Sequence, residues 1–510
     1  MCESVIWQLQ RNFYSKKGLE AWGRGDEQKV DIVPFFITSN SMIAREYSRI
    51  IFCALVDLHR LNKLVMGSPI YIAELGAGHA KFSIIFVRML SSLLHNSGLS
   101  QLKVIHIISD FTSVNFEDIS NYSDIKEYLV PLVSHTNNKN TSNVLIDFAV
   151  FDGDTDDKIH LIRSNLEISR SNPTANPLFV IGNYIFDSLV MNAYKVVPDS
   201  TGSKTILHEG RLTTFLKETD NETNLDELTS MDLHQRCNLL WSYNNKVDTD
   251  HSSDNAKINY ILEYFSKSLS PGVVFTIPVG GLNCLEKLNM LTSSKILVTL
   301  LADKGYNRIA LLEEHDEDPA IAQHGSLSMM VNILAAGEYA KIDSSKDTIV
   351  RNGFARHSTQ RNSPLDVSLL CSGVTNLPLC ESTFELGFEI GIHDVFVLRD
   401  HCEDIVSSKN NDSHDQNPKI ETICVLSELA AWDADVIFQF GKAIQLEIFN
   451  FKKIDDKHTK QITESCLRYI YGALKFIEFG IVDQFDVRTE SRSGLKKLLL
   501  TFEENDLNFI

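Results

Sequence analysis

The sequence predicts an α/β fold with a doubly wound, mostly parallel sheet, preceded by N-terminal helices and followed by a mainly helical C-terminal domain. Three observations support this prediction. Continuous apolar runs alternate with amphipathic segments over residues 66–345, as in parallel sheets covered on both faces. Before residue 66 the apolar residues follow helical spacing, and after residue 345 the alternation fades. The length of 510 residues also exceeds what one ordinary core can organise.

The first expected element is a helix within residues 38–64. Apolar side chains recur there at helical spacing, and Ser39, Asn40 or Ser41 is available to cap the helix start. This helix belongs to an expected N-terminal helical segment, residues 1–65. The chain start lacks the apolar core of a secretory signal and contains several acids, which transit peptides rarely carry. A cytoplasmic location is therefore expected, with a mitochondrial one as the alternative.

The expected sheet domain spans residues 66–345 and alternates between strands and helices. Its strands are expected at residues 70–75, 102–110, 143–152, 177–183 and 272–280. Its helices are expected at residues 80–94, at 116–133 with a break near Pro131, and at 154–169 with an acidic first turn. Residues 217–257 are polar and acidic, which predicts an insertion or a mobile lid. Residues 346–510 are expected to be mainly helical, with helices at 424–449 and 459–485.

Composition excludes several functional classes. A net charge of −19 argues against binding to nucleic acids or to anionic membranes. No run of eighteen or more apolar residues occurs, so no transmembrane helix is expected. The nine cysteines form no C-x-x-C pair, and neither a zinc site nor another metal site is therefore predicted.

The stretch "AELGAGHA", residues 73–80, lies where the first strand should give way to a helix. Glu74 ends the strand, and Gly76 and Gly78 occupy the turn. Ligands of open α/β sheets bind outside the carboxyl ends of strands, and glycines let the backbone approach a ligand closely. Position 81 is lysine rather than the third glycine of a dinucleotide fingerprint, and no P-loop pattern is present.

Acids also end the next two strands. Asp110 follows "VIHIIS", and a carboxylate there can accept hydrogen bonds from both hydroxyls of a ribose. Phe111 is placed to pack against an adenine ring or to face the core. Asp152 ends the third strand, in "AVFDGD". The alternatives are that Asp110 caps a helix or forms a turn, and that Asp152 begins a solvated helix.

The fourth strand leads into "FVIGNYIFDSLVMNAYKV", residues 179–196, which contains N-x-x-F-D-x-L with Asn183 and Asp187. E-x-G-x-G at a first strand resembles motif I of class I S-adenosylmethionine-dependent methyltransferases, which have a Rossmann-like fold. The N-x-x-F-D-x-L string resembles a segment of the MidA-like methyltransferases, a family that includes the mitochondrial arginine methyltransferase required for complex I assembly. Segments 35–40, 208–215 and 300–306 are similar to further pieces of that family, in the same order.

This resemblance implies that S-adenosylmethionine is the cofactor. It implies that the glycine turn packs on the amino-acid part of the cofactor and that Asp152 faces the adenine amino group. Glu74, Gly76, Gly78, Asp110, Phe111, Asp152 and Asn183 are the resulting cofactor-binding candidates. Asn183 and Asp187 are the catalytic candidates: Asn183 would orient the nucleophile, and Asp187 would deprotonate it or pair with a cationic substrate. The alternative for Asp187 is a cap on a helix formed by "SLVMNAY".

Three functions remain open at this point. The first is a methyltransferase acting on a protein side chain. The second is a degenerate relative that serves as a binding or assembly factor, because Tyr184, Val190 and Lys304 replace residues that are typical of the family. The third is a nicotinamide-cofactor or nucleotide enzyme on a similar sheet. The C-terminal helices are expected to be available for a protein partner.

Overall fold

The computed structural model describes most of the 510-residue chain. The described residues are 4–17, 37–122, 125–132, 142–202, 204–217, 228–229, 233–247, 255–324, 326–345, 348–358, 365–390, 418–478 and 497–502.

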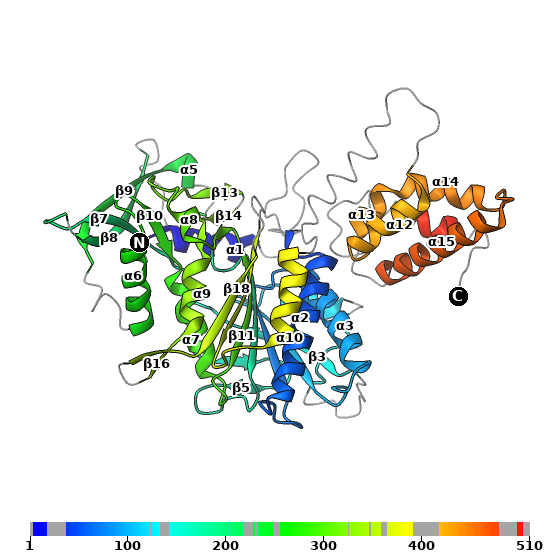
Figure 1. Cartoon of the computed structure of the whole chain (residues 1–510), viewed down its shortest axis with the longest axis horizontal. Helices are drawn as coiled ribbons and strands as arrows, with labels where there is room; N and C mark the ends of the chain where they lie inside the picture. Colours follow the sequence, from blue (N-terminus) through cyan, green and yellow to red (C-terminus); the bar gives the residue numbers. More distant parts are fainter. Residues whose placement is uncertain are drawn as a thin grey trace.

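A seven-stranded sheet forms the centre of the fold (Figure 1). Its order is β18-β19-β11-β6-β1-β2-β3. Five neighbouring strands are parallel, namely β11 (Leu297–Asp303), β6 (Leu178–Asn183), β1 (Ile70–Leu75), β2 (Val104–Asp110) and β3 (Val144–Val150). At one edge, β19 (Asp366–Ser372) and β18 (Gly353–His357) are antiparallel. The expected mostly parallel α/β sheet is therefore confirmed.

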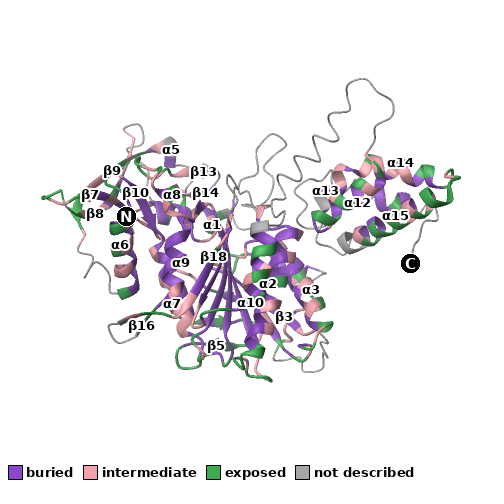
Figure 2. Cartoon of the chain, viewed as in Figure 1, coloured by how far each residue is buried: buried purple, intermediate pink, exposed green. Residues whose placement is uncertain are grey.

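Helices cover both faces of this sheet. Alternate residues of β1 show this directly, because Ile70 and Ile72 join one hydrophobic cluster and Tyr71 and Ala73 join the other. The helices of the first face are α2 (Ser41–Arg60), α3 (Lys81–His95) and α10 (Pro378–Phe384). The helices of the second face are α6 (Ala256–Ser268), α7 (Val279–Met290) and α9 (Ile333–Lys341). Figure 2 shows the central strands as buried between these layers.

Helix α2 matches the expected N-terminal helix. Of the three proposed caps, Asn40 is the one used, since its side chain accepts a hydrogen bond from the N–H of Ile43. Helix α1 (Ile6–Lys17) precedes it and buries Ile6, Leu9 and Phe13.

A second, antiparallel sheet has the order β10-β7-β8-β9. It consists of β10 (Val274–Ile277), β7 (Asn192–Pro198), β8 (Thr205–Leu216) and β9 (Cys237–Lys246). The strand expected at 272–280 therefore exists, but it pairs with β7 and not with the central sheet. Of the expected acidic insertion 217–257, residues 237–246 form β9, while residues 218–227, 230–232 and 248–254 lie outside the described part of the chain.

Two helix predictions in the sheet domain are wrong, and the helix expected at 424–449 is divided into three shorter ones, with Ala431 and Trp432 at positive φ between the first two. Residues 154–169 form a hairpin of β4 (Ile159–Leu161) and β5 (Leu166–Ile168), whose turn contains Asn165 with φ of 53°. A left-handed residue of this kind suits a tight turn and ends a helix. Of the helix expected at 116–133, only α4 (Phe116–Asn121) forms, and residues 126–132 are not helical.

The chain after residue 345 first completes the central sheet and only then becomes helical. Strands β18 and β19 belong to that sheet, so the predicted boundary of a helical domain at residue 346 is wrong. The helices that follow are α12 (Ile420–Leu429), α13 (Ala434–Gln439), α14 (Gly441–Phe451) and α15 (Lys457–Glu478). They share a hydrophobic core of their own. Within the described residues, no helix is long and apolar enough to cross a membrane.

The remaining elements are short. They are α5 (Leu233–Arg236), α8 (Ile309–Leu312), β12 (Gly305–Tyr306), β13 (Ala322–His324), β14 (Ser326–Ser328), β15 (Val331–Asn332), β16 (Ile342–Ser345), β17 (Thr348–Arg351) and the π-helix η7 (Glu385–Ile390). Among them, β14 matters most for the site, because it lies beside α1 and contributes to the wall of the pocket described next.

Candidate functional site

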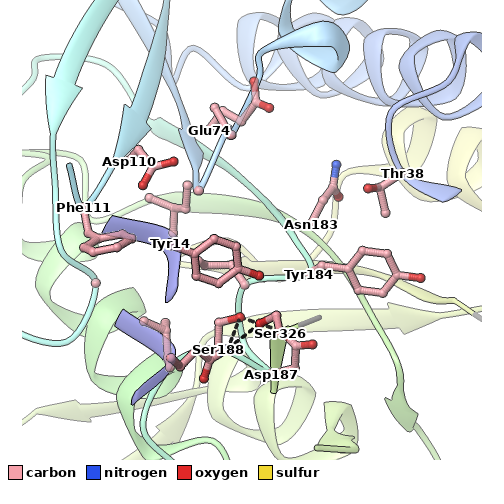
Figure 3. Close-up of a pocket in the computed structure, with 18 of the residues that line it drawn as sticks. Tyr14, Thr38, Glu74, Asp110, Phe111, Asn183, Tyr184, Asp187, Ser188 and Ser326 are labelled. Atoms are coloured by element: carbon pink, nitrogen blue, oxygen red, sulfur yellow. Dashed lines mark hydrogen bonds between the residues drawn. The ribbon is translucent and has the colours of Figure 1, made fainter. Parts of the chain in front are cut away.

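A pocket of about 160 Å³ lies where the carboxyl ends of β1, β2, β3 and β6 meet. The residues that line it include every predicted site residue: Glu74, Gly76, Gly78, Asp110, Phe111, Asp152, Asn183 and Asp187. Helix α1 and strand β14 complete its wall with Gln10, Arg11, Tyr14 and residues 326–328. Figure 3 shows the labelled residues gathered around this space from different elements. The structure thus brings the predicted residues together, and their individual roles remain predictions.

Glu74 is fixed by side chains of the core. Its Oε2 atom accepts a hydrogen bond from Ser83 Oγ at 2.6 Å and lies 2.8 Å from His106 Nε2. Its backbone carbonyl accepts a hydrogen bond from Ser109 Oγ at 2.6 Å. Since Glu74 is only 5% exposed, this network holds the carboxylate rigidly at the end of β1.

The turn after β1 requires its glycines. Gly76 and Gly78 have φ of 61° and 57°, a region that residues with a Cβ adopt at a cost. A Cβ on Gly76 would also lie 2.8 Å from Ile185 Cδ1. The next residue after this pair, His79, is buried, and burial together with the charge of Lys81 lowers its pKa to about 3. The loop therefore brings bare backbone and a neutral imidazole to the pocket.

Asp110 ends β2 and is 8% exposed. Burial raises its pKa to about 6, although hydrogen bonds from the backbone N–H groups of Phe111, Gly78 and Thr112 act in the opposite direction. These donors hold the carboxylate beside the glycine turn. Of the two alternatives for Asp110, the helix cap is wrong, because α4 begins only at Phe116 and its N-cap is Asn115. The turn agrees with the structure, because the carboxylate accepts the N–H groups of the next two residues, Phe111 and Thr112.

Asp152 is bound by a residue that the sequence did not indicate. Arg11 of α1 pairs with it through both nitrogens of its fork, with Nη2–Oδ1 at 2.9 Å and a second, short contact between Nη1 and Oδ2. Arg11 Nη2 also lies 2.9 Å from Asp154 Oδ2. Burial alone would raise the pKa of Asp152, but the hydrogen bonds and the charge of Arg11 lower it. No helix begins at Asp152, so that alternative is wrong.

Asn183 and Tyr184 follow at the end of β6. The Asn183 side-chain oxygen accepts a hydrogen bond of 3.0 Å from the hydroxyl of Tyr47, a fully buried residue of α2. Tyr184 has φ of 50°, which is unusual for a residue with a side chain. The ammonium of Lys304 lies 5.9 Å from the centre of the Tyr184 ring. Helix α2 and the residue after β11 thus set the orientation of this end of the pocket.

Asp187 lies beside a second buried acid, Asp303, at the end of β11. Asp303 Oδ2 accepts hydrogen bonds from the N–H groups of Phe186 at 3.0 Å and Asp187 at 3.1 Å. Burial raises the pKa of Asp187 to about 6, while Ser188 and Lys304 act to lower it. Burial and the nearby Asp187 charge raise the pKa of Asp303. Residues 192–198 form a strand, so Asp187 caps no helix there and that alternative is wrong.

Among the described residues, no cluster of His, Cys, Asp and Glu could hold a metal ion. The charged groups of the pocket are mainly acidic. Its acids are Glu74, Asp110, Asp152 and Asp187, and its cations are Arg11 and Lys304. Such a lining favours a neutral or cationic ligand with many hydrogen-bond donors over a polyphosphate.

Comparison with known proteins finds distant similarity to solved structures of one superfamily. No family model and no curated protein matches the chain. One solved structure is described as a superfamily member and candidate methyl transferase from Burkholderia thailandensis bound to S-adenosyl-homocysteine; it is 11% identical, with a TM-score of 0.35, over 66% of this chain and 69% of that one. Another, a native structure of an uncharacterized protein of that superfamily from the same organism, is 10% identical, with a TM-score of 0.33, over 66% and 75%.

Proposed function

We propose that this protein is an S-adenosylmethionine-dependent methyltransferase whose acceptor is a protein side chain. One observation carries the proposal. Glu74, Asp110 and Asp152 lie at or just beyond the carboxyl ends of three adjacent parallel strands, and they line a single pocket with a left-handed glycine turn. An adenosyl amino acid offers donors that match this row: an ammonium group, two ribose hydroxyls and an adenine amino group.

The residues present fit this cofactor group by group. The bare turn at Gly76 and Gly78 leaves room for the amino-acid part beside Glu74. Asp110 would accept the ribose hydroxyls, and Asp152 would accept from the adenine amino group. Arg11 lies over one face of the Phe111 ring, 5.8 Å from its centre, so the base would use the edge or the other face. The acids disfavour a nicotinamide dinucleotide because its pyrophosphate is anionic.

When bound, the cofactor supplies an activated methyl group, and the chain has to align the acceptor and exclude water. Asn183, oriented by Tyr47, would position the acceptor atom. Asp187 has a pKa of about 6, raised by burial, so at neutral pH its carboxylate can take up the acceptor's proton. Lys304 opposes the negative charge of Asp187 and keeps part of it ionised.

Isothermal titration calorimetry with S-adenosylmethionine, S-adenosylhomocysteine and NAD tests the cofactor assignment. We expect micromolar affinity for the first two ligands and none for NAD. Gly76→Val should abolish this binding, and Gly98→Val should not, because a Cβ on Gly98 has nothing within 4 Å. Binding that survives Gly76→Val unchanged would show that the pocket is misplaced.

Transfer of a labelled methyl group to lysate proteins then tests the activity. Loss of transfer in Asp187→Ala with cofactor affinity retained would support the proposed role. A second candidate function is a binding or assembly factor that keeps the cofactor but has lost transfer. The pair of Tyr184, which has a left-handed φ, and Lys304, 5.9 Å from its ring centre, favours it, because both line the pocket where the resembled family has other residues. Tight cofactor binding with no transfer to any acceptor would select this second function.

A further inference from the structure

The N-terminal helix α1 is part of the pocket although it is distant in sequence from every motif. Its buried apolar residues include Ile6, Trp7 and Leu9, which join the core cluster on the second face of the sheet. Its polar side chains reach into the site: Gln10 Nε2 donates to Ser188 Oγ at 3.0 Å and to the Leu327 carbonyl at 2.9 Å. The helix is therefore docked by packing and by hydrogen bonds on two sides of the cavity.

Arg11 extends from this helix to the acid at the end of β3. Its fork engages both oxygens of Asp152, and Asp152 Oδ1 also accepts the N–H of Asp154 at 3.0 Å. A bidentate pair fixes the plane of a carboxylate as well as its position. Of the four lone-pair directions of Asp152, the remaining one faces the hydroxyl of the exposed Thr155. That hydroxyl also lies 3.5 Å from Asp156 Oδ1, so it can turn to Asp156 and leave this place to a ligand.

The same contact determines what Asp152 can recognise. Burial acts to raise the pKa of Asp152, but the hydrogen bonds and the charge of Arg11, together with the bonds from Asp154 and Thr155, lower it overall. The carboxylate therefore stays ionised and can only accept hydrogen bonds. An ionised carboxylate pairs with an amino group on the edge of a base and repels a carbonyl oxygen placed there. Without Arg11, the carboxylate would be free to rotate, and burial would favour its protonated form, which can donate.

We propose that Arg11 is a positioning residue that, through Asp152, makes the cofactor site selective for a 6-aminopurine over a 6-oxopurine. This inference rests on the proposed function, since it assumes that an adenosyl compound occupies the pocket. It assigns the N-terminal helix a role in base recognition. Arg11 also lies over the Phe111 ring, 5.8 Å from its centre, so one side chain holds both residues expected at the adenine end.

The test compares S-adenosylhomocysteine with S-inosylhomocysteine, in which a carbonyl oxygen replaces the adenine amino group. Calorimetry on the full chain gives the ratio of the two dissociation constants. For the natural protein we expect the inosyl compound to bind roughly tenfold or more weakly, the usual range for a hydrogen bond to a charged group. Arg11→Ala should bring this ratio close to one, and Arg11→Lys, which keeps the charge but loses the fork, should restore only part of it.

Two further variants keep the test decisive. Asp152→Asn should also abolish the discrimination, because an amide can present either its oxygen or its NH₂ to the base. Lys158→Ala is the matched control, because it removes an exposed ion pair with Glu167 on the neighbouring hairpin and should leave both affinities unchanged. Thermal unfolding and hydrogen exchange of residues 6–17 report whether α1 remains docked in each variant.

The possible outcomes separate failure of the role proposed for Arg11 from failure of the proposed function. If Arg11→Ala weakens both ligands equally, Arg11 merely anchors α1 and the inference is overturned. An unchanged ratio in Arg11→Ala, with a lost one in Asp152→Asn, would also overturn it. Equal binding of both ligands by the natural protein would show that Asp152 does not read the base, although the cofactor assignment would stand. If the natural protein binds neither ligand, the proposed function itself fails.

Discussion

Individual buried carboxylates determine how the pocket responds to pH. Burial raises the pKa of both Asp110 and Asp187 to about 6, whereas an exposed aspartate in the unfolded chain titrates near 3.9. A carboxyl group whose pKa is higher in the folded state stabilises the fold below the unfolded value, and this contribution is lost as pH rises through about 6. At neutral pH both carboxyl groups are therefore ionised although they are buried, which is unfavourable. A ligand that donates hydrogen bonds to them would stabilise the ionised form.

Cofactor affinity should consequently depend on pH with a defined sign. Ribose hydroxyls donate to the ionised form of Asp110, so below pH 6 binding has to release a proton. We expect the dissociation constant of S-adenosylhomocysteine to be constant from pH 7 to 8 and to rise by up to about tenfold per pH unit below 6. Calorimetry in buffers of different ionisation enthalpy measures the released proton. The release should disappear in Asp110→Asn and persist in Asp118→Asn, which changes an acid of α4 outside the pocket.

The glycine turn can be tested at a single position. Gly76→Ala places a Cβ at φ of 61° and 2.8 Å from Ile185 Cδ1, and we expect it to lower the free energy of unfolding by about 1–2 kcal/mol. Gly202→Ala is the control, because Gly202 has φ of 70° but nothing within 4 Å of its Cβ position. Denaturant unfolding should show a loss for both variants, and calorimetry should show lost cofactor affinity for Gly76→Ala alone. Equal affinities would exclude the turn from the binding site.

At the scale of elements, the docking of α1 on the site can be tested apart from the central sheet. Leu9 is fully buried in the core cluster beneath it, and removing such a side chain costs about 2–5 kcal/mol. We expect Leu9→Ala to accelerate hydrogen exchange in residues 6–17, to leave β1 and β2 protected, and to weaken cofactor binding. Ser15→Ala, at an exposed position of the same helix, should do none of these. Loss of protection throughout the sheet would instead mean that α1 is not an independent unit.

The strands that carry the site were predictable because each is a short, continuously apolar run. All six residues of β1 are buried, as are nearly all those of β2, and acids at such strand ends must meet at one edge of a parallel sheet. The hairpin at 159–168 was missed because Ile159, Ile162 and Leu166 also fit helical spacing. There the left-handed Asn165 decides the conformation, and Ile159 and Leu161 point inward with period two.

Other parts of the site could not be predicted because they depend on tertiary placement. Arg11 and Asp152 are 141 positions apart, and nothing in the spacing of Ile6, Leu9 and Phe13 shows which pocket the helix covers. Asp303 did carry a sequence signal, because it lies at the end of an apolar strand, as Glu74 and Asp110 do. That Asp303 supports the turn before Asp187 follows only from the adjacency of β11 and β6.

For the whole molecule, the important feature is how the chain closes its central sheet. Strand β11 is the last of the five parallel strands on the side of β19. It is buried along its whole length and pairs with β19 over seven residues. Helices α12 to α15 instead bury their apolar residues among themselves. The described contacts between these helices and α2 include a 3.2 Å bond from Arg45 Nη1 to the Glu428 carbonyl and a 3.5 Å bond from the Ser41 N–H to Asp433.

This arrangement predicts where the chain can be shortened. A fragment of residues 1–390 keeps β18, β19 and α10, so we expect it to unfold cooperatively and to bind S-adenosylhomocysteine as tightly as the full chain. A fragment of residues 1–345 would expose the hydrogen-bonding edge of β11 and the core residues that β19 covers, which favours aggregation. We therefore expect the shorter fragment to be insoluble or to lack a cooperative transition. A soluble 1–345 fragment with unchanged affinity would instead show that the cofactor-binding unit ends before β18 and does not need β18 or β19.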